Sequence, residues 1–132
     1  MKKLGRLSET EMEVMQAIWE LSTPITVAKL LSLFEKTKGW KTSTLSTILS
    51  RLIDKGFLTK TMKGNVNYYS TDITLYDYQK SEASNMLATL YGGNVQKYVA
   101  AMVDSEGVTQ QDIEGLKQWF QAMTSHAGNA DE

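Results

Sequence analysis

Residues 42–71 join a helical pattern directly to a hairpin pattern: TSTLSTILSRLIDKGFLTKTMKGNVNYYST. In the first part, apolar residues recur at the spacing of one helix face, namely at Leu45, Ile48, Leu49 and Leu52. Thr42 is the expected N-cap of this helix, and Gly56 is the expected residue just after its end. The pattern therefore predicts a helix of about three turns that buries one face.

The opposite face of this helix consists of short hydroxyl side chains. Its members are Ser43, Thr44, Ser46, Thr47 and Ser50, with Arg51 beside them. Serine and threonine form helices less readily than Glu and Lys, which normally cover a face that is only solvated. We therefore interpret the hydroxyl-rich face as a binding surface.

Residues 57–71 have the pattern of a β-hairpin. β-Branched and aromatic residues lie on both sides of Gly64-Asn65, a pair that tolerates the backbone of a tight turn. Successive side chains of a strand point to opposite faces, so we expect one of Tyr68 and Tyr69 to pack inward and the other to remain exposed to solvent.

Two shorter helices are predicted before this stretch. Ser8 and Glu11 have the spacing of a capping box, which indicates a helix over about residues 9–21. Pro24 follows its end, and Thr26 is placed to cap a second helix. The order helix, helix, helix, hairpin is that of a winged helix-turn-helix domain.

The sequence after residue 72 becomes acidic and helical. Its expected helix ends are marked by Thr74 with Asp77, by Gly92-Gly93, and by Thr109 with Asp112. We expect a winged helix-turn-helix domain at 1–72, three helices at 73–124 and a flexible tail at 125–132. The predicted fold class is mainly α with a small β-hairpin wing.

The three C-terminal helices carry more apolar surface than so small a unit can cover alone. The simplest way to bury this apolar surface is association with a second copy of the chain, because two-fold homodimers are the commonest soluble oligomers. The alternative is that these helices fold back on the winged domain as one monomeric core. The expected dimer contacts are Met86, Leu87, Leu90, Val95, Tyr98, Val99, Met102, Val103, Ile113, Leu116 and Phe120.

Charge is divided unequally along the chain. Residues 1–71 carry eleven Lys or Arg against six Asp or Glu, a formal charge of +5, and residues 72–132 carry three against nine, a formal charge of −6. A basic face in a near-neutral protein suits a phosphate-bearing partner, here double-stranded DNA. The residues expected to contact DNA are Lys41, Thr42, Ser43, Thr44, Ser46, Thr47, Arg51, Lys60, Lys63 and Asn65.

The composition excludes several other classes of protein. Cysteine is absent and His126 is the only histidine, which argues against disulfides and zinc sites. No nucleophile–base pair or phosphate-cradling glycine loop occurs at usable spacing, so we expect no enzyme, no metal and no cofactor. The chain has neither a long apolar run nor a basic-then-apolar leader, which predicts a cytoplasmic protein.

Across nearly its whole length the sequence resembles the penicillinase-repressor family of bacterial transcriptional regulators, the BlaI, MecI and CopY type. The matching stretches are Leu7-Ser8, Glu11–Met15, Ile18-Trp19, Trp40, Arg51–Phe57, Tyr68-Tyr69 and Asp77-Tyr78. The resemblance implies a homodimer that occupies a pseudo-palindromic operator and represses transcription, commonly of β-lactamase or other resistance genes.

The same resemblance implies a way in which repression is relieved. In typical members a membrane sensor-protease triggers a cut within the dimerisation helices, and the spacing places that bond near Ala101-Met102 here. Well-known relatives have Asn-Phe at this place. Copper-responsive relatives sense metal through C-terminal cysteines, which this chain lacks.

Two other functions remain open at the level of sequence. The alternative to DNA binding is a protein interaction module, in which the basic face of the winged domain would contact an acidic partner. A repressor of the MarR type would respond to a small molecule, but such proteins usually have dimerisation helices at both ends.

Two residues also have alternative roles: Arg51 can pair with Asp54 at i+3, and Trp40 can form a lid over the third helix.

Overall fold

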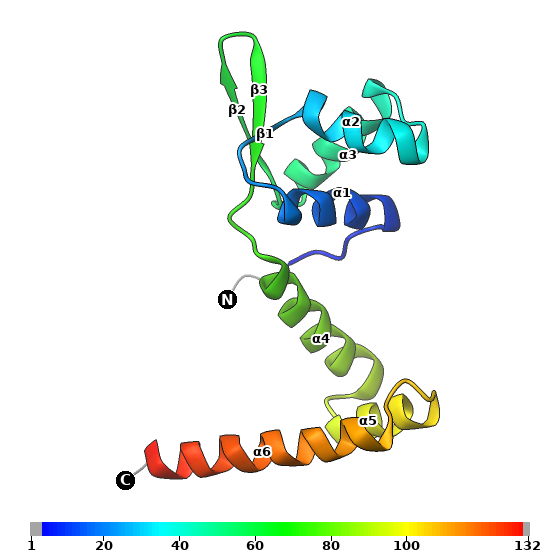
Figure 1. The fold of residues 1–132 in the computed structure, drawn as a ribbon, viewed down its shortest axis with the longest axis vertical. Helices are drawn as coiled ribbons and strands as arrows, with labels where there is room; N and C mark the ends of the chain where they lie inside the picture. The colour runs from blue at the N-terminus through cyan, green and yellow to red at the C-terminus, as the bar shows by residue number, and fades with distance from the viewer. Residues whose placement is uncertain (1–3, 131–132) are drawn as a thin grey trace. The chain divides into compact units, whose positions relative to one another are not determined.

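The computed structural model describes the backbone of residues 4–130 and the side chains of residues 4–125. The chain divides into two compact units, one ending at Ser84 and the other beginning at Asn85 (Figure 1).

The first unit is a winged helix-turn-helix fold. Its elements are α1 (Glu9–Glu20), β1 (Ile25–Thr26), α2 (Val27–Lys38), α3 (Thr42–Asp54), β2 (Thr59–Lys63), β3 (Val66–Ser70) and the first turns of α4 (Leu75–Tyr91). The strands form an antiparallel sheet in the order β1-β3-β2. The β2–β3 hairpin extends beyond the three preceding helices as the predicted wing (Figure 1).

The predicted start of α1 is confirmed, and that of α3 is wrong by one residue. Ser8 and Glu11 form the full capping box, with the Ser8 amide 2.7 Å from the Glu11 carboxylate and the Glu11 amide 3.2 Å from the Ser8 hydroxyl. At α3 the N-cap is Lys41, which makes no side-chain cap bond, and Thr42 is already helical. The cause is the extended backbone of Lys41, whose carbonyl accepts the first helical hydrogen bond from the Leu45 amide at 3.2 Å.

The wing closes at the predicted dipeptide. Lys63 pairs with Val66 across the Gly64-Asn65 loop, and Gly64 has a φ of 63°. A positive φ at the first loop position is the conformation that favours glycine in tight hairpin turns. Tyr69 is buried and Tyr68 is half-buried, as the alternation of the strand requires.

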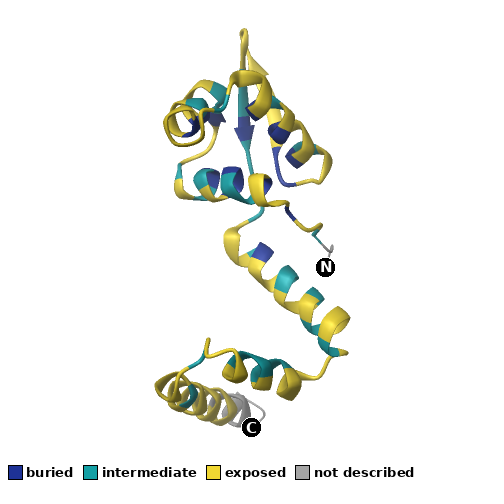
Figure 2. Cartoon of the chain, turned by 90° about the vertical axis from the view of Figure 1, so that its right-hand side faces the viewer, coloured by how far each residue is buried: buried dark blue, intermediate teal, exposed yellow. Residues whose placement is uncertain are grey.

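The core of the first unit lies between the inner faces of α1, α2 and α3 and the sheet (Figure 2). Its fully buried apolar side chains are Val14, Met15, Ile18, Leu30, Leu45, Leu49, Leu52 and Phe57. Burial of one such large side chain contributes on the order of 2 kcal/mol. α3 supplies three members of this set, so its position is fixed by the core.

An ion pair between a buried carboxylate and an exposed lysine joins the beginning of α1 to the end of α3. The side chain of Glu11 is 2% exposed, and the Lys55 ammonium lies 2.6 Å from its carboxylate. The same ammonium donates to the Arg6 carbonyl at 2.9 Å. Burial alone would raise the pKa of Glu11, but hydrogen bonds from Lys55 and Ser8 outweigh it and lower the pKa below its ordinary value.

We expect Lys55→Met to lower the free energy of unfolding by about 1–2 kcal/mol near neutral pH, because the Glu11 carboxylate loses its cation in a buried place. This free-energy change allows for solvent screening at Lys55, whose side chain is 36% exposed. Because the folded pKa of Glu11 is lowered, its ion pair stabilises the fold above the ordinary carboxyl pKa, and this stabilisation is lost as pH falls through the lowered value.

The difference between wild type and Lys55→Met should therefore shrink below about pH 4. Urea unfolding at a series of pH values measures it, with the exposed Lys36→Met as the matched control. A difference that is absent at neutral pH, or that does not change on acidification, would contradict the assigned pair.

The first turns of α4 pack on the winged core through Tyr78. Its buried hydroxyl accepts from the Leu7 amide at 3.0 Å and donates to Glu82 at 2.9 Å. Its ring lies 5.6 Å from Phe57 and 6.1 Å from Trp19 between centroids. The division between the two compact units falls within α4, after Ser84.

The second unit contains the end of α4, α5 (Val95–Asp104) and α6 (Gln110–Ala130). The predicted helix ends are present: Thr109 and Asp112 form reciprocal hydrogen bonds, and Gly92 and Gly93 both have positive φ. α6 continues to Ala130, so the segment expected as a flexible tail is helical up to that residue, and 131–132 lie outside the described part. A helix propagates through its backbone hydrogen bonds, which require no apolar periodicity.

The end of α5 places a non-glycine residue in the left-handed region. Glu106 has a φ of 63°, and its amide donates to the Val103 carbonyl at 3.0 Å. Glu106→Gly should raise the free energy of unfolding by about 0.5–1 kcal/mol, because glycine adopts this backbone without steric cost. Urea unfolding followed by circular dichroism measures the gain. Glu106→Ala is the control, since it removes the charge and keeps the strain, and an equal gain in both variants would contradict the explanation.

Candidate nucleic-acid interface

The position of α3 exposes its hydroxyl-rich face. Leu45, Ile48, Leu49 and Leu52 are at most 4% exposed and hold the opposite face against the core. Of the residues proposed to contact DNA on or beside α3, Lys41, Thr42, Ser43, Thr44, Thr47 and Arg51 are exposed, and Ser46 is half-buried. The first turn of α3 thus presents four consecutive exposed side chains, from Lys41 to Thr44.

One hydroxyl on this face already forms a hydrogen bond within α3. The Thr47 hydroxyl donates to the Ser43 carbonyl at 3.0 Å, one turn earlier in the same helix. Its proton is used in that bond, so the exposed part of Thr47 offers a methyl group and an oxygen lone pair. These groups match a thymine methyl or a base amino donor in the major groove.

The wing presents its basic side chains on two faces. Lys60, Lys63 and Asn65 are all exposed. Lys60 pairs with Tyr69 and Lys63 pairs with Val66, and residues three apart in a strand point to opposite faces. The hairpin therefore carries a cation on each side, with Asn65 in the loop between its strands.

Two lysines of the winged unit, Lys38 and Lys55, form ion pairs within the protein. Lys55 pairs with Glu11, and Lys38 lies 2.9 Å from Glu13, so acidic residues of α1 neutralise both. No local pattern in the sequence shows the pair of Lys55 with Glu11, because the two residues lie 44 positions apart.

Arg51 does not form the local pair with Asp54 that the sequence left open. Among the residues whose side chains are described, Arg51, Lys41, Lys60 and Lys63 make no ion pair. Their exposed positions on α3 and the wing are those proposed for contact with phosphates.

Trp40 packs against the core through a residue of α2. Its ring stacks on Phe34, with 4.8 Å between centroids and 23° between planes, and packs against the core just before α3. This contact fixes the chain where it enters α3.

The residues proposed for dimerisation are uncovered within one chain. None of the side chains of residues 85–125 is buried, and Figure 2 shows no buried position in α5. Leu90, Val95, Phe120, Leu116, Met86 and Val103 are exposed, and Leu87, Tyr98, Val99, Met102 and Ile113 are half-buried. Trp119 and Met123 add exposed apolar surface on α6 that the sequence-based list of contacts did not include.

The described part of the chain shows neither a group of potential metal ligands nor a helix apolar and long enough to cross a bilayer.

The expected cleavage position, Ala101-Met102, lies inside α5. The carbonyls of these two residues accept hydrogen bonds from the amides of Ser105 and Gly107 at 3.0 and 3.2 Å.

Comparison with known proteins gives the family. The profile of the penicillinase repressor family matches residues 7–122. The chain belongs to this family. A penicillinase repressor of Bacillus licheniformis is 30% identical over 132 residues, covering all of both chains. The methicillin resistance regulatory protein MecI of Staphylococcus aureus strain N315 is 25% identical over 115 residues, which is 87% of this chain and 93% of MecI.

Solved structures of a family member match the winged unit. The DNA-binding domain of the repressor BlaI is 38% identical, with a TM-score of 0.51, and the match covers 59% of this chain and 94% of that domain. Monomeric BlaI of B. licheniformis in complex with the blaP half-operator matches with the same identity and coverage and a TM-score of 0.50. The family therefore has the winged fold that residues 42–71 predict.

Proposed function

We propose that this chain is a DNA-binding transcriptional repressor of resistance genes and that α3 and the wing contact its operator. The main support is the hydroxyl-rich, positively edged face of α3, held outward by a fully packed apolar face, in a member of the penicillinase repressor family. The related BlaI domain has been solved with a half-operator, and the relatives are named for penicillinase and methicillin resistance. A family of transcriptional repressors is not a class of enzymes.

In the proposed complex the first turns of α3 enter the major groove. Ser43, Thr44 and Thr47 reach base edges there, while Lys41 and Arg51 contact phosphates or a guanine. Hydroxyl contacts are individually modest, so DNA shape contributes to specificity. The second group of contacts is supplied by Lys60, Lys63 and Asn65 of the wing, which bind the adjacent backbone or minor groove.

We further propose that residues 85–124 form a homodimer interface and that residues 1–84 act as the DNA-binding part. A dimer would cover the exposed apolar side chains of this region and would place two α3 helices on two half-sites of a pseudo-palindrome. In the alternative of one monomeric core, the same side chains would instead be covered by residues 1–84.

Relief of repression by a membrane sensor-protease is a separate proposal. A cut at Ala101-Met102 would fall within the hydrogen-bonded turns of α5, so the helix would have to open before a protease could bind the bond in extended form. Cleavage there would divide the proposed dimer interface. Binding to operator DNA would place the protein in the cytoplasm.

Selection of duplexes from a randomised DNA pool tests the proposed function. We expect enrichment of a pseudo-palindromic sequence, with affinity that falls steeply as salt concentration rises, because bound cations displace counterions from phosphates. Absence of enrichment, or weak binding that does not change with salt, would favour a protein interaction module instead.

A further inference from the structure

Residues 4–7, here called the N-terminal strap, form hydrogen bonds with two helices that are distant in sequence. Leu7 is 8% exposed, and its amide donates to the Tyr78 hydroxyl in the first turns of α4 at 3.0 Å. The Arg6 carbonyl accepts from the Lys55 ammonium at 2.9 Å, and Lys55 is the C-cap of α3. The strap therefore connects the end of the helix proposed to contact DNA with the beginning of α4.

The Tyr78 hydroxyl is the group that links the strap to α4. It accepts from the Leu7 amide and donates to the Glu82 carboxylate at 2.9 Å. The ring of Tyr78 packs separately, against Phe57 and Trp19. Removal of the hydroxyl alone would leave the Leu7 N–H without this acceptor in a buried place, and the ring would keep its contacts.

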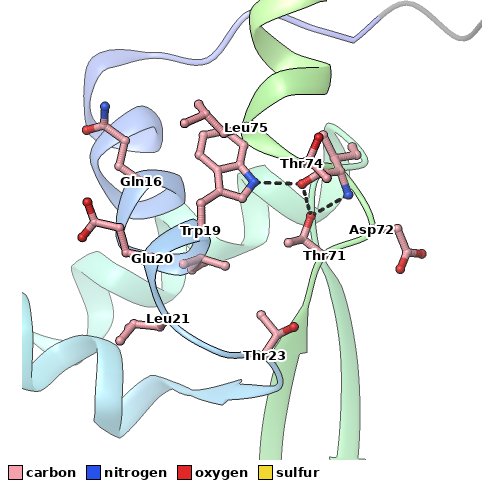
Figure 3. A pocket seen from close by; sticks show the side chains of 11 residues that line it. Gln16, Trp19, Glu20, Leu21, Thr23, Thr71, Asp72, Thr74 and Leu75 are labelled. Atoms are coloured by element: carbon pink, nitrogen blue, oxygen red, sulfur yellow. Dashed lines mark hydrogen bonds between the residues drawn. The ribbon is translucent and has the colours of Figure 1, made fainter.

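The segment that connects β3 to α4 is only partly packed on α1. The Trp19 indole N–H donates to the Ile73 carbonyl at 2.8 Å (Figure 3). Beside this bond lies a cavity of about 550 Å³, whose lining residues come from the end of α1 and from the connecting segment up to Leu75. Because the cavity separates part of the segment from α1, close packing alone does not fix the path of the chain into α4. Individual hydrogen bonds to α4 therefore matter more for its direction.

We propose that Tyr78 is a positioning residue, which through the N-terminal strap holds the first turns of α4 in one direction relative to α1, α2 and α3. α4 continues as one helix to Tyr91 and so extends beyond Ser84 into the region proposed for dimerisation. In a dimer, the direction of α4 would set the separation of the two α3 helices and hence the half-site spacing that the protein accepts. This last role rests on the proposed function.

Residual dipolar couplings of the full-length, ¹⁵N-labelled chain test the position of α4 without DNA. In the wild type, we expect the amides of residues 75–84 and of residues 9–70 to fit one alignment tensor. In Tyr78→Phe, residues 75–84 should need a tensor of their own, and the Leu7 amide should exchange with solvent at least about tenfold faster. Tyr76→Phe is the matched control, because it removes the hydroxyl of an exposed tyrosine from the same helix. Unchanged Leu7 exchange in Tyr78→Phe, or one tensor for both groups of amides, would overturn the proposal.

Duplexes that carry two copies of the selected half-site at different spacings test the consequence for DNA. Tyr78→Phe should bind a single half-site within about twofold of the wild type, because the residue contacts no DNA, but its discrimination between spacings should fall at least about fivefold. Tyr76→Phe should keep the discrimination of the wild type. Equal discrimination in Tyr78→Phe and the wild type, or a loss of half-site affinity in Tyr78→Phe, would overturn the role in spacing. If the wild type bound no duplex, the proposed function would fail, and the dipolar couplings would still decide whether Tyr78 positions α4.

Discussion

Replacing Arg51 and Lys63 together by alanine should weaken binding to the selected operator about 100-fold near physiological salt, through the loss of one contact from α3 and one from the wing. If both contacts are to phosphate, the slope of log affinity against log salt should become shallower by about two. Both side chains are exposed and make no ion pair in the described part of the chain, so the fold should be unaffected. Fluorescence anisotropy at several salt concentrations measures both quantities.

The matched control for this pair is Lys97→Ala with Lys117→Ala, which removes two exposed cations from the second unit. We expect the control to keep most of the affinity and the original salt slope. Equal losses in the two double variants would show that only net charge matters. An unchanged affinity for the Arg51 and Lys63 variant would contradict the proposed interface.

Met102→Asp should weaken self-association at least about 30-fold, because it places a carboxylate in the proposed apolar interface without a partner. Met102 lies on the side of α5 that also carries Tyr98 and Val99, and it is half-buried within one chain. Loss of the dimer would also reduce operator affinity, because the two half-sites would then be bound independently. Sedimentation velocity over a concentration series measures the change.

Gln96→Asp is the control for this substitution, since it adds the same charge to α5 at an exposed polar position. It should sediment as the wild type does. A Met102→Asp protein that remains dimeric at micromolar concentration would mean that the interface lies elsewhere. A wild-type chain that is monomeric at every concentration would refute the dimer itself.

Local patterns predicted most of the fold correctly. The capping boxes at Ser8 and Thr109 occur as expected, because the interacting groups are three residues apart in sequence. The apolar spacing in α3 correctly separated its buried face from its exposed face. The Gly64-Asn65 pair fixed both the position of the turn and the register of the hairpin.

Features that depend on distant contacts could not be predicted in this way. β1 has two residues, too few for any periodicity, and it exists because Ile25 and Thr26 pair with β3. The packing of the first turns of α4 on the winged unit includes the hydrogen bond between Leu7 and Tyr78, 71 positions apart. For the same reason the sequence identified the cations of the candidate interface but did not show that Glu11 neutralises Lys55.

We propose that the exposed face of α3 and the wing bind duplex DNA. An NMR titration of the ¹⁵N-labelled protein with the selected duplex tests this contact most directly. We predict that the largest amide shifts fall on residues 41–51 and 60–65, with small shifts on the outer face of α1. Largest shifts elsewhere in the chain, or none at saturating DNA, would contradict the account.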